Sequence, residues 1–190
     1  MKKLLVFSLI GLALSACKKE PTCVPPASGE TPFTVVEGLE FGMPLSEALL
    51  CPLFDSIHMY SETLIDGYGM YASVPSCYTL VADTSDNVKS VVIRAFYADT
   101  AVIRQYFESF VAYNQAKYGT GKKERNITGR PTDGLDPYSL YQYTWQICDG
   151  LQINAWPLTS YMNWEHDLNL IGQGVPGDTL MRAAQVWYSL

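Results

Sequence analysis

The chain has 190 residues, of which 48% are hydrophobic and 17% charged, and its formal net charge is −6. This length and hydrophobic content predict one folded domain with its own core, and they exclude a disordered or collagen-like chain. An acidic chain without a basic stripe is a poor nucleic-acid binder, because neutralisation of phosphate drives that affinity. We therefore expect no nucleic-acid partner.

Residues 1–16 have the pattern of an export signal. Lys2 and Lys3 precede an apolar run from Leu4 to Leu14, which is shorter than the ~20 residues that span a bilayer and has the length of a signal-peptide core. The run ends in Leu14-Ser15-Ala16-Cys17, which resembles the lipobox of bacterial lipoproteins. The resemblance implies cleavage before Cys17, diacylglycerol on its thiol and an acyl chain such as palmitate on its amine. An ordinary secretory signal, cut at Ser15-Ala16, is the alternative.

The residues after Cys17 predict how the chain is anchored. Two or three acyl chains hold a protein stably on a bilayer, since each buried CH₂ contributes about 0.8 kcal/mol. In the sorting rule that this motif resembles, Asp beside the lipidated cysteine favours the inner membrane. Lys18 therefore indicates the outer membrane, on its periplasmic face or at the cell surface. Residues 17–32 contain four prolines and predict a lipidated, extended tether ahead of a single domain at 33–190. The expected partners are the membrane, through the lipid, and other envelope proteins.

The first half of the domain predicts strands around a short helix. Residues 33–36 favour a strand, and residues 44–51 favour a short helix that begins at Pro44 and stops before Pro52. Residues 78–82 and 88–97 flank a turn-forming segment and predict a hairpin. The second of these strands is apolar on both faces, so we expect it to be central in its sheet.

The second half of the domain predicts one long helix and another hairpin. Asp99 is a good N-cap for a helix that runs to about residue 118, where Gly119 supplies the stop. Residues 119–136 predict a long loop. Apolar and polar residues alternate over 141–147 and 151–155, and a three-residue loop ending in Gly150 places Trp145 opposite Ile153. Residues 184–190 favour a final strand. The expected class is α+β, an antiparallel sheet with one main helix (99–118) and a short N-terminal helix (44–51).

Four cysteines remain if Cys17 carries lipid, and an export compartment permits disulfides between them. We expect Cys51 to pair with Cys77 inside the domain, while Cys148 at a hairpin tip can reach Cys23 on the tether. Each bridge contributes roughly 2–4 kcal/mol. The sequence has no C-x-x-C and no ligand-like histidine spacing, so we expect no metal ion and no cofactor.

The sequence presents no recognisable catalytic unit, and we assign no catalytic residue. It contains neither G-x-S-x-G nor H-E-x-x-H, and we interpret His58 and His166 as structural. Exposed aromatic clusters mark ligand or partner surfaces. The candidates for such a surface are the aromatic residues in or near predicted loops, namely Tyr138, Trp156, Tyr161 and Trp164.

Residues 38–48, Gly-Leu-Glu-Phe-Gly-Met-Pro-Leu-Ser-Glu-Ala, are similar to the G-M-x-x-x-E-V helix start of small outer-membrane lipoproteins of the SmpA/OmlA (BamE-like) type. The resemblance implies short N-terminal helices beside an antiparallel sheet, and a role in envelope assembly through binding of other proteins. The first functional hypothesis is accordingly a non-catalytic envelope lipoprotein that binds or scaffolds. The alternative is a lipid-anchored protein that binds or processes glycan, with Glu165 and Asp167 beside Trp164 and Tyr161.

Overall fold

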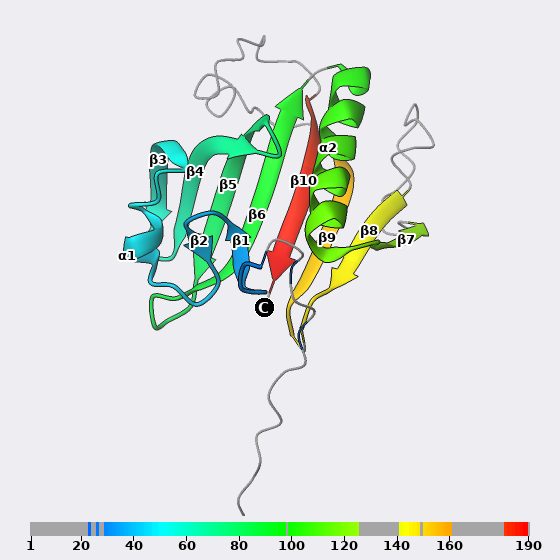
Figure 1. Cartoon of the computed structure of the whole chain (residues 1–190). Helices are drawn as coiled ribbons and strands as arrows, with labels where there is room; N and C mark the ends of the chain where they lie inside the picture. Colours follow the sequence, from blue (N-terminus) through cyan, green and yellow to red (C-terminus); the bar gives the residue numbers. More distant parts are fainter. Residues whose placement is uncertain are drawn as a thin grey trace, which may run out of the picture.

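The computed structural model describes Cys23, Pro26 and residues 29–97, 99–125, 141–148, 150–160 and 181–189. These residues form ten strands and two helices (Figure 1). In chain order they are β1 (Thr34–Val36), β2 (Leu39–Glu40), α1 (Leu45–Ala48), β3 (Phe54–Ser61), β4 (Leu64–Tyr71), β5 (Val74–Ala82), β6 (Val88–Tyr97), α2 (Thr100–Tyr118), β7 (Lys122–Arg125), β8 (Tyr141–Gln146), β9 (Gln152–Ser160) and β10 (Met181–Ser189).

The expected α+β class is wrong, because the chain is mostly β. One antiparallel sheet holds eight strands in the order β3-β4-β5-β6-β10-β9-β8-β7, beside a two-stranded sheet of β1 and β2. Strands take 53% of the described residues and helices 19%. The helix expected at 44–51 is a single turn, Leu45–Ala48. The long loop expected at 119–136 begins instead with a strand, Lys122–Arg125, which pairs with β8.

Composition explains the strands that the sequence pattern missed. β3 lies at one edge of the sheet, and most of its side chains are exposed or half-buried, so it lacks an apolar alternation. β4 contains Gly67 and Gly69, which are unfavourable in an ordinary strand. Both glycines are required by close packing: a Cβ at Gly67 would collide with the ring of Phe54, and one at Gly69 with the carbonyl oxygen of Leu53.

Several individual elements lie where the sequence predicts them. α2 begins after Asp99, whose carboxylate accepts hydrogen bonds from the N–H groups of Ala101 (2.6 Å) and Val102 (3.4 Å). β6 is central, between β5 and β10, and the C-terminal residues form a strand. The β8–β9 hairpin has the predicted register, with Trp145 opposite Ile153 and Gly150 at φ 96°.

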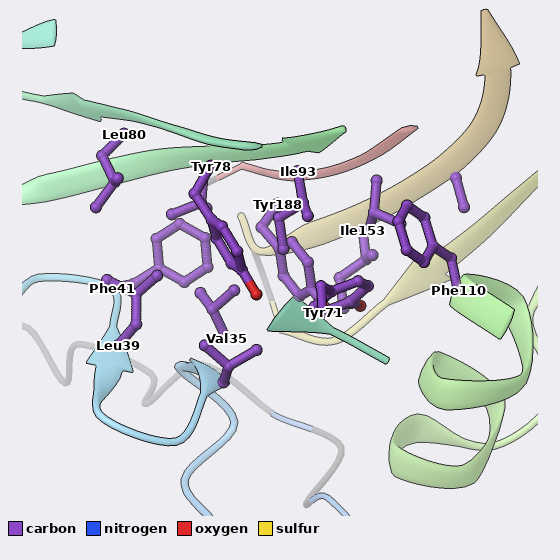
Figure 2. Close-up of a cluster of buried hydrophobic side chains, with 14 of the residues drawn as sticks. Val35, Leu39, Phe41, Tyr71, Tyr78, Leu80, Ile93, Phe110, Ile153 and Tyr188 are labelled. Atoms are coloured by element: carbon purple, nitrogen blue, oxygen red, sulfur yellow. Dashed lines mark hydrogen bonds between the residues drawn. The ribbon is translucent and has the colours of Figure 1, made fainter. Parts of the chain in front are cut away.

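The core lies on one face of the large sheet, called here the covered face. Its two covering layers are α2, which packs over β10, β9 and β6, and the small β1–β2 sheet (Figure 1). Figure 2 shows side chains from both layers meeting the tyrosines of the sheet. Val35, Leu39 and Phe41 come from the β1–β2 segment and Phe110 from α2. All four are buried.

A closed hydrogen-bonded ring lies inside this core and joins β4, α2 and β10. The Nδ2 of Asn114 donates to the hydroxyl of Tyr71 (2.8 Å), and the hydroxyl of Tyr188 donates to the Oδ1 of Asn114 (2.8 Å). The two hydroxyls are 2.7 Å apart, so Tyr71 donates to Tyr188 and closes the ring. The second N–H of the Asn114 amide donates to the Phe110 carbonyl (2.8 Å). Every polar atom of the ring is therefore satisfied although the site is buried.

The cysteines pair differently from the main expectation. Cys23 is bonded to Cys148, as the position of the hairpin tip allowed, whereas Cys51 and Cys77 remain buried thiols. The predicted Cys51–Cys77 bridge is wrong because the two side chains lie on opposite sides of the sheet. Cys51 belongs to the core on the covered face, whereas Cys77 alternates with the core residues Tyr78, Leu80 and Ala82 of β5 and therefore points the other way.

Candidate functional site

The face of the sheet opposite α2, called here the second face, carries most of the polar side chains of the strands together with the buried Tyr68, Cys77 and Phe96. In the core-facing strands the buried apolar residues alternate with these polar positions, as at Ile153 and Asn154 in β9. The strand register aligns one row of second-face residues across all eight strands. In spatial order the row is His58, Asp66, Thr79, Val92, Trp187, Asn154, Thr144 and Lys122.

The first part of this face is the Asp66 cluster, which comprises His58, Asp66, Thr79, Arg94 and Gln185. Asp66 lies between His58 on β3 and Thr79 on β5. Thr79 Oγ1 accepts a hydrogen bond from Arg94 Nη1 (3.0 Å), and Arg94 Nε donates to Gln185 Oε1 (2.8 Å). Thr79 thus separates the guanidinium group from the carboxylate.

Asp66 is the unusual member of this cluster. Asp66 is only 6% exposed, and its buried Oδ1 has no hydrogen-bond partner among the described residues. Leaving a buried acceptor unsatisfied costs about 1–3 kcal/mol, and more for a charged group. This oxygen is a cost to the fold, and because it is buried it does not face solvent.

The second part of this face is the Trp187 platform, formed by Trp187, Ser90, Asn154, Gln152 and Thr144. The Trp187 side chain is 40% exposed, and its Nε1 donates to Ser90 Oγ (2.8 Å). Beside it, Asn154 Oδ1 accepts hydrogen bonds from Thr144 Oγ1 (3.0 Å) and Gln152 Nε2 (3.2 Å). These bonds fix the amide orientation, so the Asn154 N–H groups remain for another acceptor.

The second face is suited to binding a polar ligand by hydrogen bonds and stacking. Trp187 offers an aromatic surface, and its neighbours offer uncharged donors and acceptors. The same geometry gives no support to a thiol–imidazole nucleophile. Cys77 is aligned through Tyr68 with Ser56 rather than with His58, so the two backbones are separated by two strand spacings, about 9.5 Å, and by two further residues along the strand.

The residues singled out from the sequence have mixed positions. Cys17, Tyr138, Tyr161, Trp164, Glu165, His166 and Asp167 lie outside the described residues. Trp156 lies on β9 at the register position of Gln185, and its side chain is outside the described part. His58, interpreted as structural, lies on edge strand β3 opposite Asp66 and contacts the Tyr60 ring (centroids 4.6 Å apart).

Trp187 and Asp66 were not among the site residues predicted from the sequence. The polar alternation in β8 and β9 already predicted a face bearing Thr144, Gln152 and Asn154, but no pattern placed Trp187 on it. That placement depends on the pairing of β10 with both β6 and β9. Asp66 had no signal, because its strand is interrupted by glycine.

Among the described residues, no three His, Cys, Asp or Glu side chains are grouped so that they could hold a metal ion. Within the same residues, no helix combines the length and the apolar character needed to cross a membrane. Comparison with known proteins found no matching family model, no matching curated protein and no matching solved structure.

Proposed function

We propose that this protein is a lipid-anchored, non-catalytic binding module of a bacterial envelope, held at the outer membrane through Cys17. The observation that carries the proposal is the Leu14-Ser15-Ala16-Cys17 motif at the end of a short apolar run with two leading lysines. The Cys23–Cys148 disulfide supports it, because structural disulfides persist in oxidising, exported compartments. The second face of the sheet is the surface we assign to binding.

Lipidation is tested by mass spectrometry of the N-terminal peptide of the full chain expressed in a bacterium. The expected product starts at Cys17 and carries acyl chains, and the protein sediments with membranes. Cys17→Ser should remove both properties. Lys18→Asp is the matched control: it should keep the lipid and, by the sorting rule, move the protein to the inner membrane. An unmodified Cys17 in a membrane-associated chain would refute the anchor.

A glycan is the second candidate for the ligand, and one observation favours it. The half-exposed Trp187 ring lies beside Asn154, Gln152 and Thr144, which carry no charge. An aromatic ring with amide and hydroxyl neighbours matches a neutral sugar, which stacks its C–H face and hydrogen-bonds through its hydroxyls.

The glycan candidate is tested by sedimentation of the protein with isolated peptidoglycan and with insoluble neutral polysaccharide. Trp187→Ala should abolish co-sedimentation. Tyr141→Ala is the control, because Tyr141 is equally exposed (40%) but lies on β8 among residues of the covered face. Equal loss in both variants, or none in Trp187→Ala, would contradict a sugar site at the Trp187 platform.

A further inference from the structure

The chain from Cys23 onward is attached to the domain at several points. Cys23 is bonded to Cys148, and Pro26 is buried. Glu30 Oε2 is 2.7 Å from Lys117 Nζ, which also donates to the carbonyl of Thr34 (2.9 Å). The first described attachment of the chain to the domain is therefore at Cys23.

The attachment points lie at one end of the domain, called here the disulfide end. Cys148 belongs to the turn between β8 and β9, and Lys117 belongs to the last turn of α2. The two elements meet there, because Trp145 Nε1 donates to the Gly119 carbonyl (2.9 Å). The β5–β6 turn and the end of β10 lie at the same end, as Figure 1 shows. The start of α2 lies at the opposite end.

We propose that the Cys23–Cys148 disulfide makes the disulfide end the surface that faces the lipid bilayer, and so fixes which way the second face is presented. The inference rests on the proposed lipidation of Cys17. From Cys17 to Cys23 there are six Cα steps, which span at most about 20 Å. Without the disulfide, the next attachment is the buried Pro26, which is nine steps from Cys17 and allows about 30 Å. The bridge therefore shortens the distance that the domain can move from the membrane by about a third.

Charge at the disulfide end defines how it meets the bilayer. The β3–β4 and β5–β6 turns place Glu62, Asp83 and Asp86 there, with the exposed Lys89 beside Asp83, and Lys117 at this end is buried and already paired. A surface of net negative charge is not attracted to anionic headgroups. The disulfide end is thus held close to the bilayer by its tether rather than by adsorption.

The orientation is tested with the lipidated full chain in phosphatidylcholine vesicles that contain a trace of headgroup-labelled acceptor lipid. A donor fluorophore is attached through a non-natural amino acid at Ala116 or at Ala101, two exposed alanines of α2. They are fifteen residues apart, about 22 Å along the helix axis. Energy transfer from Ala116, at the disulfide end, should exceed that from Ala101 by roughly two-fold or more over this distance.

A ten-residue Gly-Ser insertion between Glu20 and Pro21 lengthens the tether and leaves the disulfide in place. It should bring the two transfer efficiencies closer together. Equal or reversed efficiencies in the uninserted, vesicle-bound protein would overturn the inference while leaving the anchor intact. A protein that does not bind vesicles and has no acyl chain by mass spectrometry would instead refute the proposed function. The two failures are therefore distinguishable.

Discussion

The Asn114–Tyr71–Tyr188 ring gives the sharpest test of how this core is held together. Tyr188→Phe removes one oxygen from a fully buried site and changes no other packing atom. Two groups then lose their partners: the Tyr71 hydroxyl loses its acceptor, and Asn114 Oδ1 loses its donor. Each unsatisfied buried group costs about 1–3 kcal/mol. We expect Tyr188→Phe to lower the free energy of unfolding by about 2–5 kcal/mol.

Tyr113→Phe is the matched control. Tyr113 is adjacent to Asn114 in α2 and its ring packs against Tyr71 (centroids 5.0 Å apart), but no hydrogen bond of its hydroxyl to a described residue is present. Removing this oxygen should change the free energy of unfolding by less than about 0.5 kcal/mol. Both variants are compared by urea unfolding of residues 17–190 carrying Cys17→Ser, followed by circular dichroism.

Coupling within the ring supplies the second half of the test. Asn114→Leu alone leaves the Tyr188 hydroxyl hydrogen without an acceptor. In the double variant Asn114→Leu with Tyr188→Phe, only the Tyr71 hydroxyl remains unpaired. The double variant should therefore lose about 1–2 kcal/mol less free energy of unfolding than the two single variants lose together. Strict additivity, or a Tyr188→Phe protein as stable as the unchanged chain, would refute the account of the ring.

Three further predictions follow from burial and from the disulfide. Desolvation raises the pKa of Tyr71, Tyr78, Tyr118 and Tyr188 above the ordinary value of 10.0. The stability that this shift contributes is complete below about pH 10. Above that pH the free energy of unfolding should fall by about 1.4 kcal/mol per pH unit for each tyrosine, which urea unfolding at a series of pH values measures. Phenolate absorbance from all four tyrosines at a pH where the protein is still folded would contradict this pKa shift. Replacing Cys23 and Cys148 by alanine opens a loop of 125 residues and should cost up to about 5 kcal/mol, whereas alkylation of the unreduced, denatured chain should modify Cys51 and Cys77 and recover Cys23 and Cys148 as one linked peptide. Asp66→Asn should raise the melting temperature, because it replaces a carboxyl group whose buried Oδ1 has no partner among the described residues; a lower melting temperature would show that the carboxyl group has a stabilising partner.

The sequence predicts those elements of this fold that depend on local signals. The α2 start depends on one capping side chain, Asp99, and the β8–β9 register depends on alternation and a glycine at a left-handed position, so both are visible in a short window. The number of strands is not visible in the same way. β4 is a strand because its glycines admit the Phe54 ring and the Leu53 backbone, and that requirement comes from packing between segments.

The candidate site shows the same division between local and long-range information. Alternation predicts which residues of β8 and β9 share a face, but the position of Trp187 among them requires the pairing of β10 with strands that precede it by many residues. The expected Cys51–Cys77 bridge failed for a related reason. Sequence gives the spacing of two cysteines, and only the sheet shows that their side chains point to opposite faces.

The central position of β10 has a consequence for when this protein can fold. The last strand of the chain lies between β6 and β9 and supplies Tyr188 to the core. Until those nine residues emerge, the sheet is split into two halves and the polar groups of Tyr71 and Asn114 are unmatched. In a chain that emerges from its N-terminus, as the proposed export requires, the eight-stranded sheet and the hydrogen-bonded ring can therefore be completed only after β10 has emerged.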